Sequence, residues 1–128
     1  MSSSYQTPDD LLLARQLAEK APLESQAWLA FDHAVFREGG RIGAKEREWI
    51  ALGVALATQC AYCIDVHVRG AKRQGSTAEE LAEVAAVAAA VKGGATLAHG
   101  LMALRLHEDR DGSATAAAAA TAAPAPRA

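Results

Sequence analysis

Several features on which small proteins commonly depend are scarce in this chain of 128 residues. Aromatic residues make up only 5% of it, so a core must come mainly from Ala, Leu and Val, although 51% of the residues are hydrophobic. No alternation of apolar and polar residues indicates a β-strand. The sequence has only two cysteines, Cys60 and Cys63, so all its thiol chemistry lies at one place. These scarcities predict an all-α fold with a single thiol centre.

A surplus of charge of either sign is also missing. The formal net charge is −2, which gives no electrostatic case for nucleic acid or an anionic membrane as partner. The first ten residues lack the apolar segment of a signal peptide. The longest apolar run, residues 84–91, stops at Lys92, Gly93 and Gly94, short of the roughly 18 residues that span a bilayer. We therefore expect a cytoplasmic protein that binds neither nucleic acid nor membrane.

Helical spacing and capping signals predict about six helices. We expect them at about residues 8–20, 22–38, 44–58, 60–74, 78–91 and 95–107. Thr7 and Pro8 start the first, and the pair Gly39 and Gly40 ends the second. Thr77 opens the fifth in a capping box with Glu80, and Gly93-Gly94 separates the fifth from the sixth.

The composition changes after residue 108. Residues 114–128 are almost entirely Ala, Thr and Pro, with nothing large to bury. We expect one helical domain over residues 1–108, followed by a low-complexity tail over residues 109–128 that is disordered. The Ala-rich, aromatic-poor helices also suggest apolar surface buried between subunits, so we expect an obligate homo-oligomer.

The chemistry-bearing residues gather in one stretch, residues 48–67. Cys60, Cys63 and His67 stand three and four residues apart, so a helix through them would place all three on one stripe. Thiols in the first turn of a helix have lowered pKa values, because unpaired N–H groups stabilise the thiolate. Glu48 belongs to the preceding helix and could reach His67 or a thiol only from there. In a reducing compartment, a Cys-x-x-Cys pair is more often catalytic or metal-binding than structural.

The pattern Glu48…Cys60-x-x-Cys63-x-x-x-His67 resembles the alkylhydroperoxidase D-like branch of the carboxymuconolactone decarboxylase family. The likeness extends over the preceding stretch 46–52 and the following stretch 76–83, and covers roughly Phe31 to Leu104. It resembles the shorter, single-unit members, whose substrates are mostly unassigned. Where the peroxidase branch carries a histidine just before the second cysteine, this chain has Tyr62.

The resemblance implies an orthogonal helical fold that assembles into trimers or hexamers, and reduction of hydroperoxides through the cysteine pair. It implies that Cys63 attacks the peroxide, that Cys60 resolves the sulfenic acid as a disulfide, and that Glu48 and His67 relay protons. A dithiol such as a protein-bound lipoamide or a thioredoxin-like protein would then reduce the disulfide. This chemistry calls for no cofactor and no metal.

Other interpretations remain open at this point. Both cysteines could be inert helix residues, or the pair could open and close in a non-enzymatic redox sensor or scaffold oligomer. Cys60, Cys63 and His67 could bind zinc, with Glu48 or His99 as a fourth ligand. A decarboxylase-type lactone enzyme would not need the cysteines, and Arg69 is the only evident carboxylate-binding residue near the motif.

Overall fold

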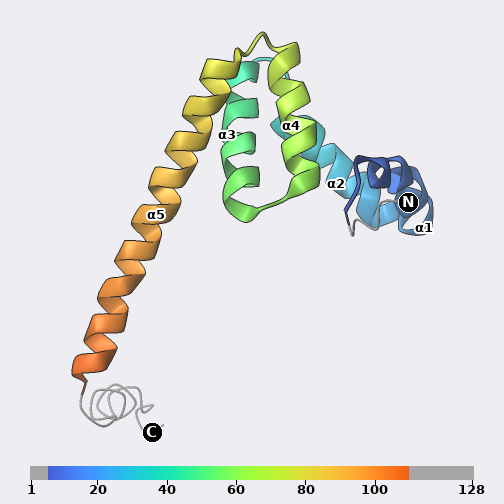
Figure 1. Ribbon diagram of the computed structural model, residues 1–128. Helices are drawn as coiled ribbons and strands as arrows, with labels where there is room; N and C mark the ends of the chain where they lie inside the picture. Colours follow the sequence, from blue (N-terminus) through green and yellow to red (C-terminus); the bar gives the residue numbers. More distant parts are fainter. Residues whose placement is uncertain (1–5, 110–128) are drawn as a thin grey trace, which may run out of the picture. The chain divides into compact units, whose positions relative to one another are not determined.

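The computed structural model describes residues 6–109, and every regular element among them is helical. The helices are η1 (Pro8–Leu13, a 3₁₀ helix), α1 (Ala14–Lys20), α2 (Pro22–Val35), α3 (Ala44–Thr58), α4 (Ala61–Arg73) and α5 (Ala78–Glu108) (Figure 1). The chain divides into two compact units, residues 1–90 and 91–128, and α5 passes from the first into the second. The prediction of an all-α fold is confirmed.

Helices α3 and α4 form an antiparallel pair that packs side by side in the first unit (Figure 1). Helix α3 ends where Gln59 adopts a left-handed conformation with φ of 58°. The Cys60 N–H then donates to Ala55 O at 3.0 Å and the Gln59 N–H to Leu56 O at 3.3 Å, the two bonds of a Schellman motif. This turn places Cys60 at the N-cap of α4.

The start of α3 is held against the turn between α4 and α5. Trp49 Nε1 donates to Ser76 Oγ at 2.8 Å, and Lys45 lies over the Trp49 ring. The predicted capping box of α5 is present, since Thr77 and Glu80 exchange both side-chain-to-backbone hydrogen bonds. Lys45 Nζ also donates to Glu80 Oε1 at 2.7 Å, and this hydrogen bond is the main reason that the pKa of Glu80 is lowered.

The N-terminal segment is fastened to the first turn of α4. Thr7 caps η1 in a capping box with Asp10, as the sequence predicts, although residues 8–13 form a 3₁₀ helix before α1 begins. The Tyr62 hydroxyl donates to Asp10 Oδ2 at 2.5 Å, across 52 positions of sequence. Tyr62, the residue just before Cys63, therefore holds η1 against α4.

The Asp10–Tyr62 contact has a predictable pH dependence. The Tyr62 hydrogen bond, with a second from the Thr7 backbone, lowers the pKa of Asp10, while Asp10 raises the pKa of Tyr62. The contact therefore contributes fully between the ordinary pKa values of the two groups, about 4 and 10. It is lost as the pH falls through the lowered pKa of Asp10, or rises through the raised pKa of Tyr62.

Tyr62→Phe should consequently return the pKa of Asp10 toward its ordinary value. An NMR titration of the Asp10 carboxyl carbon in both proteins measures this directly. The nearby Asp9, whose side chain has no hydrogen bond to Tyr62, serves as the internal control. An Asp10 midpoint that is the same in the two proteins would contradict the contact.

Helix α2 is shorter than the sequence predicts. It ends at Val35, before the glycine pair, and Gly39 and Gly40 lie in the following connection with φ of 79° and 90°. Arginine side chains donate hydrogen bonds to the backbone carbonyl groups here, in place of the N–H groups that further helical turns would supply. Arg37 donates to Ala34 O at 2.7 Å, and Arg47 of α3 donates to the carbonyl oxygens of Arg37 and Gly39.

The prediction of separate fifth and sixth helices is wrong. Residues 78–108 form the single helix α5, which continues through Gly93 and Gly94. A glycine inside a helix costs about 1 kcal/mol relative to alanine but keeps its N–H, so two of them do not by themselves end a helix. The Thr96 hydroxyl bonds back to Lys92 O at 3.0 Å instead of capping a new helix start.

Few apolar side chains are buried in the described part of the chain. The buried core consists of Leu52, Ala55 and Ala71, and large apolar residues such as Trp28, Phe31 and Leu101 are more than half exposed. Helix α5 is long and apolar enough to cross a membrane by length and composition, and none of that stretch is buried. The sequence argument overlooked it by assuming a break at residues 92–94. One such helix is weak evidence for a membrane span.

The division into a helical domain over residues 1–108 and a disordered tail over residues 109–128 remains a prediction. Apart from Asp109, the tail lies outside the described residues.

Candidate redox site

The two cysteines are joined in a disulfide at the start of α4. Their Cα atoms are 5.3 Å apart, and Cys60 Sγ accepts a hydrogen bond from the Cys63 N–H at 3.3 Å. The cap of the helix is thus a sulfur atom, which receives one of the otherwise unpaired N–H groups of the first turn. This geometry fits the expectation that the pair sits where a helix N-terminus stabilises a thiolate.

Glu48 and His67 meet across the α3–α4 interface. Glu48 Oε2 lies 2.8 Å from His67 Nδ1, and the two side chains are only 16% and 19% exposed. An ionised carboxylate can only accept a hydrogen bond, so Nδ1 carries the hydrogen and Nε2 is left to exchange a proton. The structure therefore brings together the two residues that the sequence could place only on neighbouring helices.

Two further residues shape this pair. The Phe36 ring, at the end of α2, stacks on the His67 imidazole with ring centres 5.1 Å apart. Gly70, one turn after His67, is buried, and an added Cβ there would fall on the Glu48 carboxylate. The absence of a side chain at position 70 thus makes room for Glu48, while Phe36 supports one face of the imidazole.

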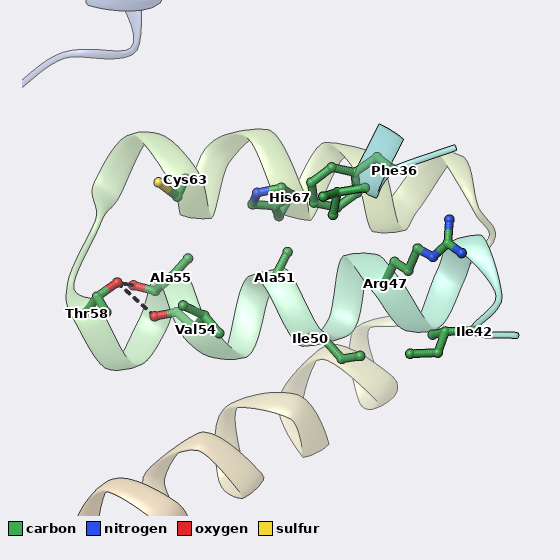
Figure 2. A pocket seen from close by; sticks show the side chains of 11 residues that line it. Phe36, Ile42, Arg47, Ile50, Ala51, Val54, Ala55, Thr58, Cys63 and His67 are labelled. Atoms are coloured by element: carbon green, nitrogen blue, oxygen red, sulfur yellow. Dashed lines mark hydrogen bonds between the residues drawn. The ribbon is translucent and has the colours of Figure 1, made fainter. Parts of the chain in front are cut away.

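A cavity of about 450 Å³ opens beside these residues. Its apolar wall is formed mainly by Val35, Phe36, Ile42, Ile50, Val54 and Ala55. Its polar lining consists of Arg47, Thr58, Cys63 and His67 (Figure 2). The Thr58 hydroxyl is turned back onto its own helix and donates to Val54 O at 2.8 Å. Of the two cysteines, Cys63 lines the cavity and Cys60 does not.

The two sulfurs consequently differ in environment. Cys60 occupies the helix N-cap and its sulfur accepts a hydrogen bond from a backbone N–H. Such a hydrogen bond stabilises a thiolate, which is the form that attacks another sulfur. Cys63 shares the cavity with His67, whose pairing with Glu48 leaves a ring nitrogen for proton exchange. Figure 2 shows the Cys63 and His67 side chains along the same face of α4. A molecule in the cavity would therefore meet one sulfur and one proton carrier.

Sequence reasoning did not identify Phe36 or Arg47 as site residues. Phe36 lines the cavity from the end of α2 and Arg47 from the first turns of α3, and no spacing within the motif indicates either. Arg69, the arginine that the sequence suggested, pairs instead with Asp65 on its own helix and does not line the cavity.

The zinc interpretation gains no support from the geometry. Over residues 6–109, no group of three or more His, Cys, Asp or Glu side chains is arranged to hold a metal ion. His99 belongs to α5, in the second unit. Elemental analysis of the purified protein remains the direct test of bound zinc.

Comparisons with known proteins show which family this chain resembles. The family model described as carboxymuconolactone decarboxylase family matches residues 22–106. "Uncharacterized protein 4 in cox locus" of Paracoccus denitrificans is 40% identical over 87 residues, which cover 68% of this chain and 78% of that protein. The crystal structure of apo-lpg0406, a carboxymuconolactone decarboxylase family protein from Legionella pneumophila, matches with a TM-score of 0.63 and 27% identity. That match covers 77% of this chain and 88% of the other. The family match confirms the resemblance inferred from the motif, and the chain belongs to the carboxymuconolactone decarboxylase family.

Proposed function

We propose that this protein is a thiol-dependent hydroperoxide reductase that cycles between the Cys60–Cys63 dithiol and disulfide. The observation that carries the proposal is the cavity lined by both Cys63 and His67, with Glu48 Oε2 2.8 Å from Nδ1 of that histidine. Membership of the family supports thiol redox chemistry in general, and the site geometry favours peroxide as the oxidant.

The first step makes Cys63 the nucleophile. Its thiolate attacks the terminal oxygen of the hydroperoxide, the O–O bond breaks, and the sulfur is oxidised to a sulfenic acid. His67 Nε2, which takes the proton of the Cys63 thiol when the thiolate forms, gives that proton to the leaving alkoxide, which departs as an alcohol. Glu48 holds the imidazole in the tautomer and orientation that this transfer needs, and stabilises its protonated form.

The second step restores the disulfide seen in the structure. The Cys60 thiolate attacks the sulfenic sulfur of Cys63, the S–O bond breaks, and the oxygen leaves as water after protonation. An external dithiol then reduces the disulfide by exchange and is itself oxidised to a disulfide. The net reaction converts one hydroperoxide and one dithiol into an alcohol, water and a disulfide.

The proposal is tested by following peroxide consumption with dihydrolipoamide or dithiothreitol as reductant. We expect turnover that depends on protein concentration and on the reductant. Consumption no faster than that of the reductant alone would contradict a peroxidase. If intact-mass analysis then showed reversible loss of two hydrogens without turnover, the non-enzymatic redox sensor would be favoured.

A decarboxylase that acts on a lactone, the activity after which the family is named, is a second candidate. Arg47 would supply the cation in the cavity that binds a carboxylate of the substrate. Such a reaction does not need the cysteine pair. Its activity would survive replacement of both cysteines by serine, whereas peroxide reduction would not.

We further propose that the protein works as a homo-oligomer, a trimer or a hexamer. The described chain buries few apolar side chains and leaves large ones such as Leu97 and Leu101 exposed, at 78% and 69%. Burial of such residues between subunits would contribute about 25 cal/mol for each Å² removed from water. Light scattering should give three or six times the mass of one chain, and a stable monomer at micromolar concentration would contradict this.

We also place the protein in the cytoplasm, where dithiol reductants are available. The apolar helix α5 makes this worth testing. After cell lysis without detergent and ultracentrifugation, the protein should remain in the supernatant. Release from the pellet only by detergent would instead indicate that α5 lies in a membrane.

A further inference from the structure

Arg47 stands apart from the other residues that line the cavity. It contributes a permanent positive charge to a wall that is otherwise largely aliphatic. It belongs to the first turns of α3, whereas Thr58, near Cys63, is the last residue of that helix. Positions 47 and 58 are about 16 Å apart along the helix axis, at 1.5 Å per residue. Figure 2 accordingly shows Arg47 and Cys63 at opposite ends of the row of lining side chains.

Within the described residues, Arg47 is bonded to backbone carbonyl groups and forms no ion pair with a carboxylate. Its two terminal nitrogens donate to the backbone carbonyl oxygens of Arg37 and Gly39, which are uncharged acceptors. None of the ion pairs among residues 6–109 includes Arg47, and the nearby Glu48 carboxylate is bound to His67. A guanidinium has five N–H donors, so it can hold these carbonyls and still pair with an anion.

We propose that the cavity binds an amphipathic organic hydroperoxide that carries a carboxylate. The carboxylate would pair with Arg47, the apolar body would lie along Ile42, Ile50 and Val54, and the hydroperoxide would meet Cys63 at the other end. A volume of about 450 Å³ is within the range of small-molecule sites. The chemistry at Cys63 rests on the proposed function, whereas the binding of the carboxylate does not.

The binding test uses unreactive probes and the oxidised, full-length protein. Isothermal titration calorimetry compares decanoate with decanol, which has the same chain but no charge. Wild-type protein should bind decanoate about tenfold more tightly, since a charge-assisted pair with a guanidinium contributes about that much. Arg47→Gln should remove this preference, and Arg47→Lys should retain part of it. Arg69→Gln, which removes an exposed cation outside the cavity, should keep the full preference.

Decanol is also the control for folding, because its affinity should be the same in wild type and Arg47→Gln. If Arg47→Gln no longer binds decanol either, the Arg47→Lys protein is used instead. A retained preference of Arg47→Lys for decanoate over decanol would support the proposal, and equal affinities for the two probes would contradict it. Equal affinities of wild type for the two probes would overturn the proposal, as would an Arg47→Gln protein with an unchanged preference. Absence of binding by either probe would also overturn it and would indicate that another chain covers the cavity.

Turnover separates this inference from the proposed function. With a fatty-acid hydroperoxide, Arg47→Gln should lower kcat/KM about tenfold. With cumene hydroperoxide, which has no carboxylate, Arg47→Gln should lower kcat/KM much less, and Arg69→Gln, outside the cavity, should leave kcat/KM unchanged with both peroxides. Arg47-dependent binding of decanoate by a protein without peroxidase activity would refute the proposed function alone. Peroxidase activity whose kcat/KM for the fatty-acid hydroperoxide is the same in wild type and Arg47→Gln would refute only the carboxylate site.

Discussion

Replacing Cys63 with serine is expected to lower peroxide turnover by about 10³-fold or more, because a serine hydroxyl is not ionised at neutral pH and cannot replace a thiolate nucleophile. Cys63 is the sulfur-bearing residue that lines the cavity beside His67, so its loss removes the group that a bound peroxide would meet. The measurement is peroxide consumption with a dithiol reductant under saturating conditions.

Cys60→Ser provides the matched control, because it changes the other sulfur by the same single atom. This variant should complete the first oxidation at close to the wild-type rate but fail to turn over with the disulfide-exchanging reductant. Comparable steady-state activity in Cys63→Ser and wild type would show that the cysteine in the cavity is not the nucleophile.

Gly70→Ala is expected to lower turnover about 10²-fold, although it replaces no cysteine, acid or base. The new Cβ would fall on the Glu48 carboxylate, which is the end of a flexible side chain and would move away from His67. Loss of a positioned proton-transfer group typically costs 10²–10⁴-fold. Stability should change little, because alanine is the better helix former by about 1 kcal/mol and offsets the displacement.

Gly53→Ala is the control for this experiment. Gly53 lies within α3, and a Cβ there would meet only Val84 Cγ1, at 3.9 Å, which is an ordinary contact. Activity should stay at the wild-type level. A Gly70→Ala enzyme with wild-type kcat and an unchanged pH profile would contradict a role for the Glu48–His67 pair.

Local signals in the sequence were enough to predict much of the fold. The bounds of α3, residues 44–58, and the capping box at Thr77 were predicted as observed, because charged first turns and capping residues act over a few positions. The continuity of α5 was not predicted, because the effect of Gly93 and Gly94 depends on whether a nearby residue can cap a new helix. Thr96 does not cap one.

The site was predictable only where its residues share a helix. The spacing of Cys60, Cys63 and His67 fixes their common face, whereas Glu48 could only be assigned to the preceding helix, and the likeness to the family added its role as a proton relay. Phe36 lies where α2 ends, and Arg47 lies on α3 with its guanidinium bonded to carbonyl groups of the connection between the two helices. Contacts of this kind depend on tertiary structure and leave no periodic trace in the sequence.

The central claim, that Cys63 is the sulfur oxidised first by the peroxide and that Glu48 and His67 carry the proton for this step, has a direct test. The reduced Cys60→Ser protein is treated with one equivalent of cumene hydroperoxide in the presence of dimedone, which traps sulfenic acids. Mass spectrometry should then find the dimedone adduct on Cys63. The adduct should form much more slowly in the double variant that combines Cys60→Ser with Glu48→Gln. A protein that forms no adduct on Cys63, while Cys63→Ser readily forms one on Cys60, would contradict the account.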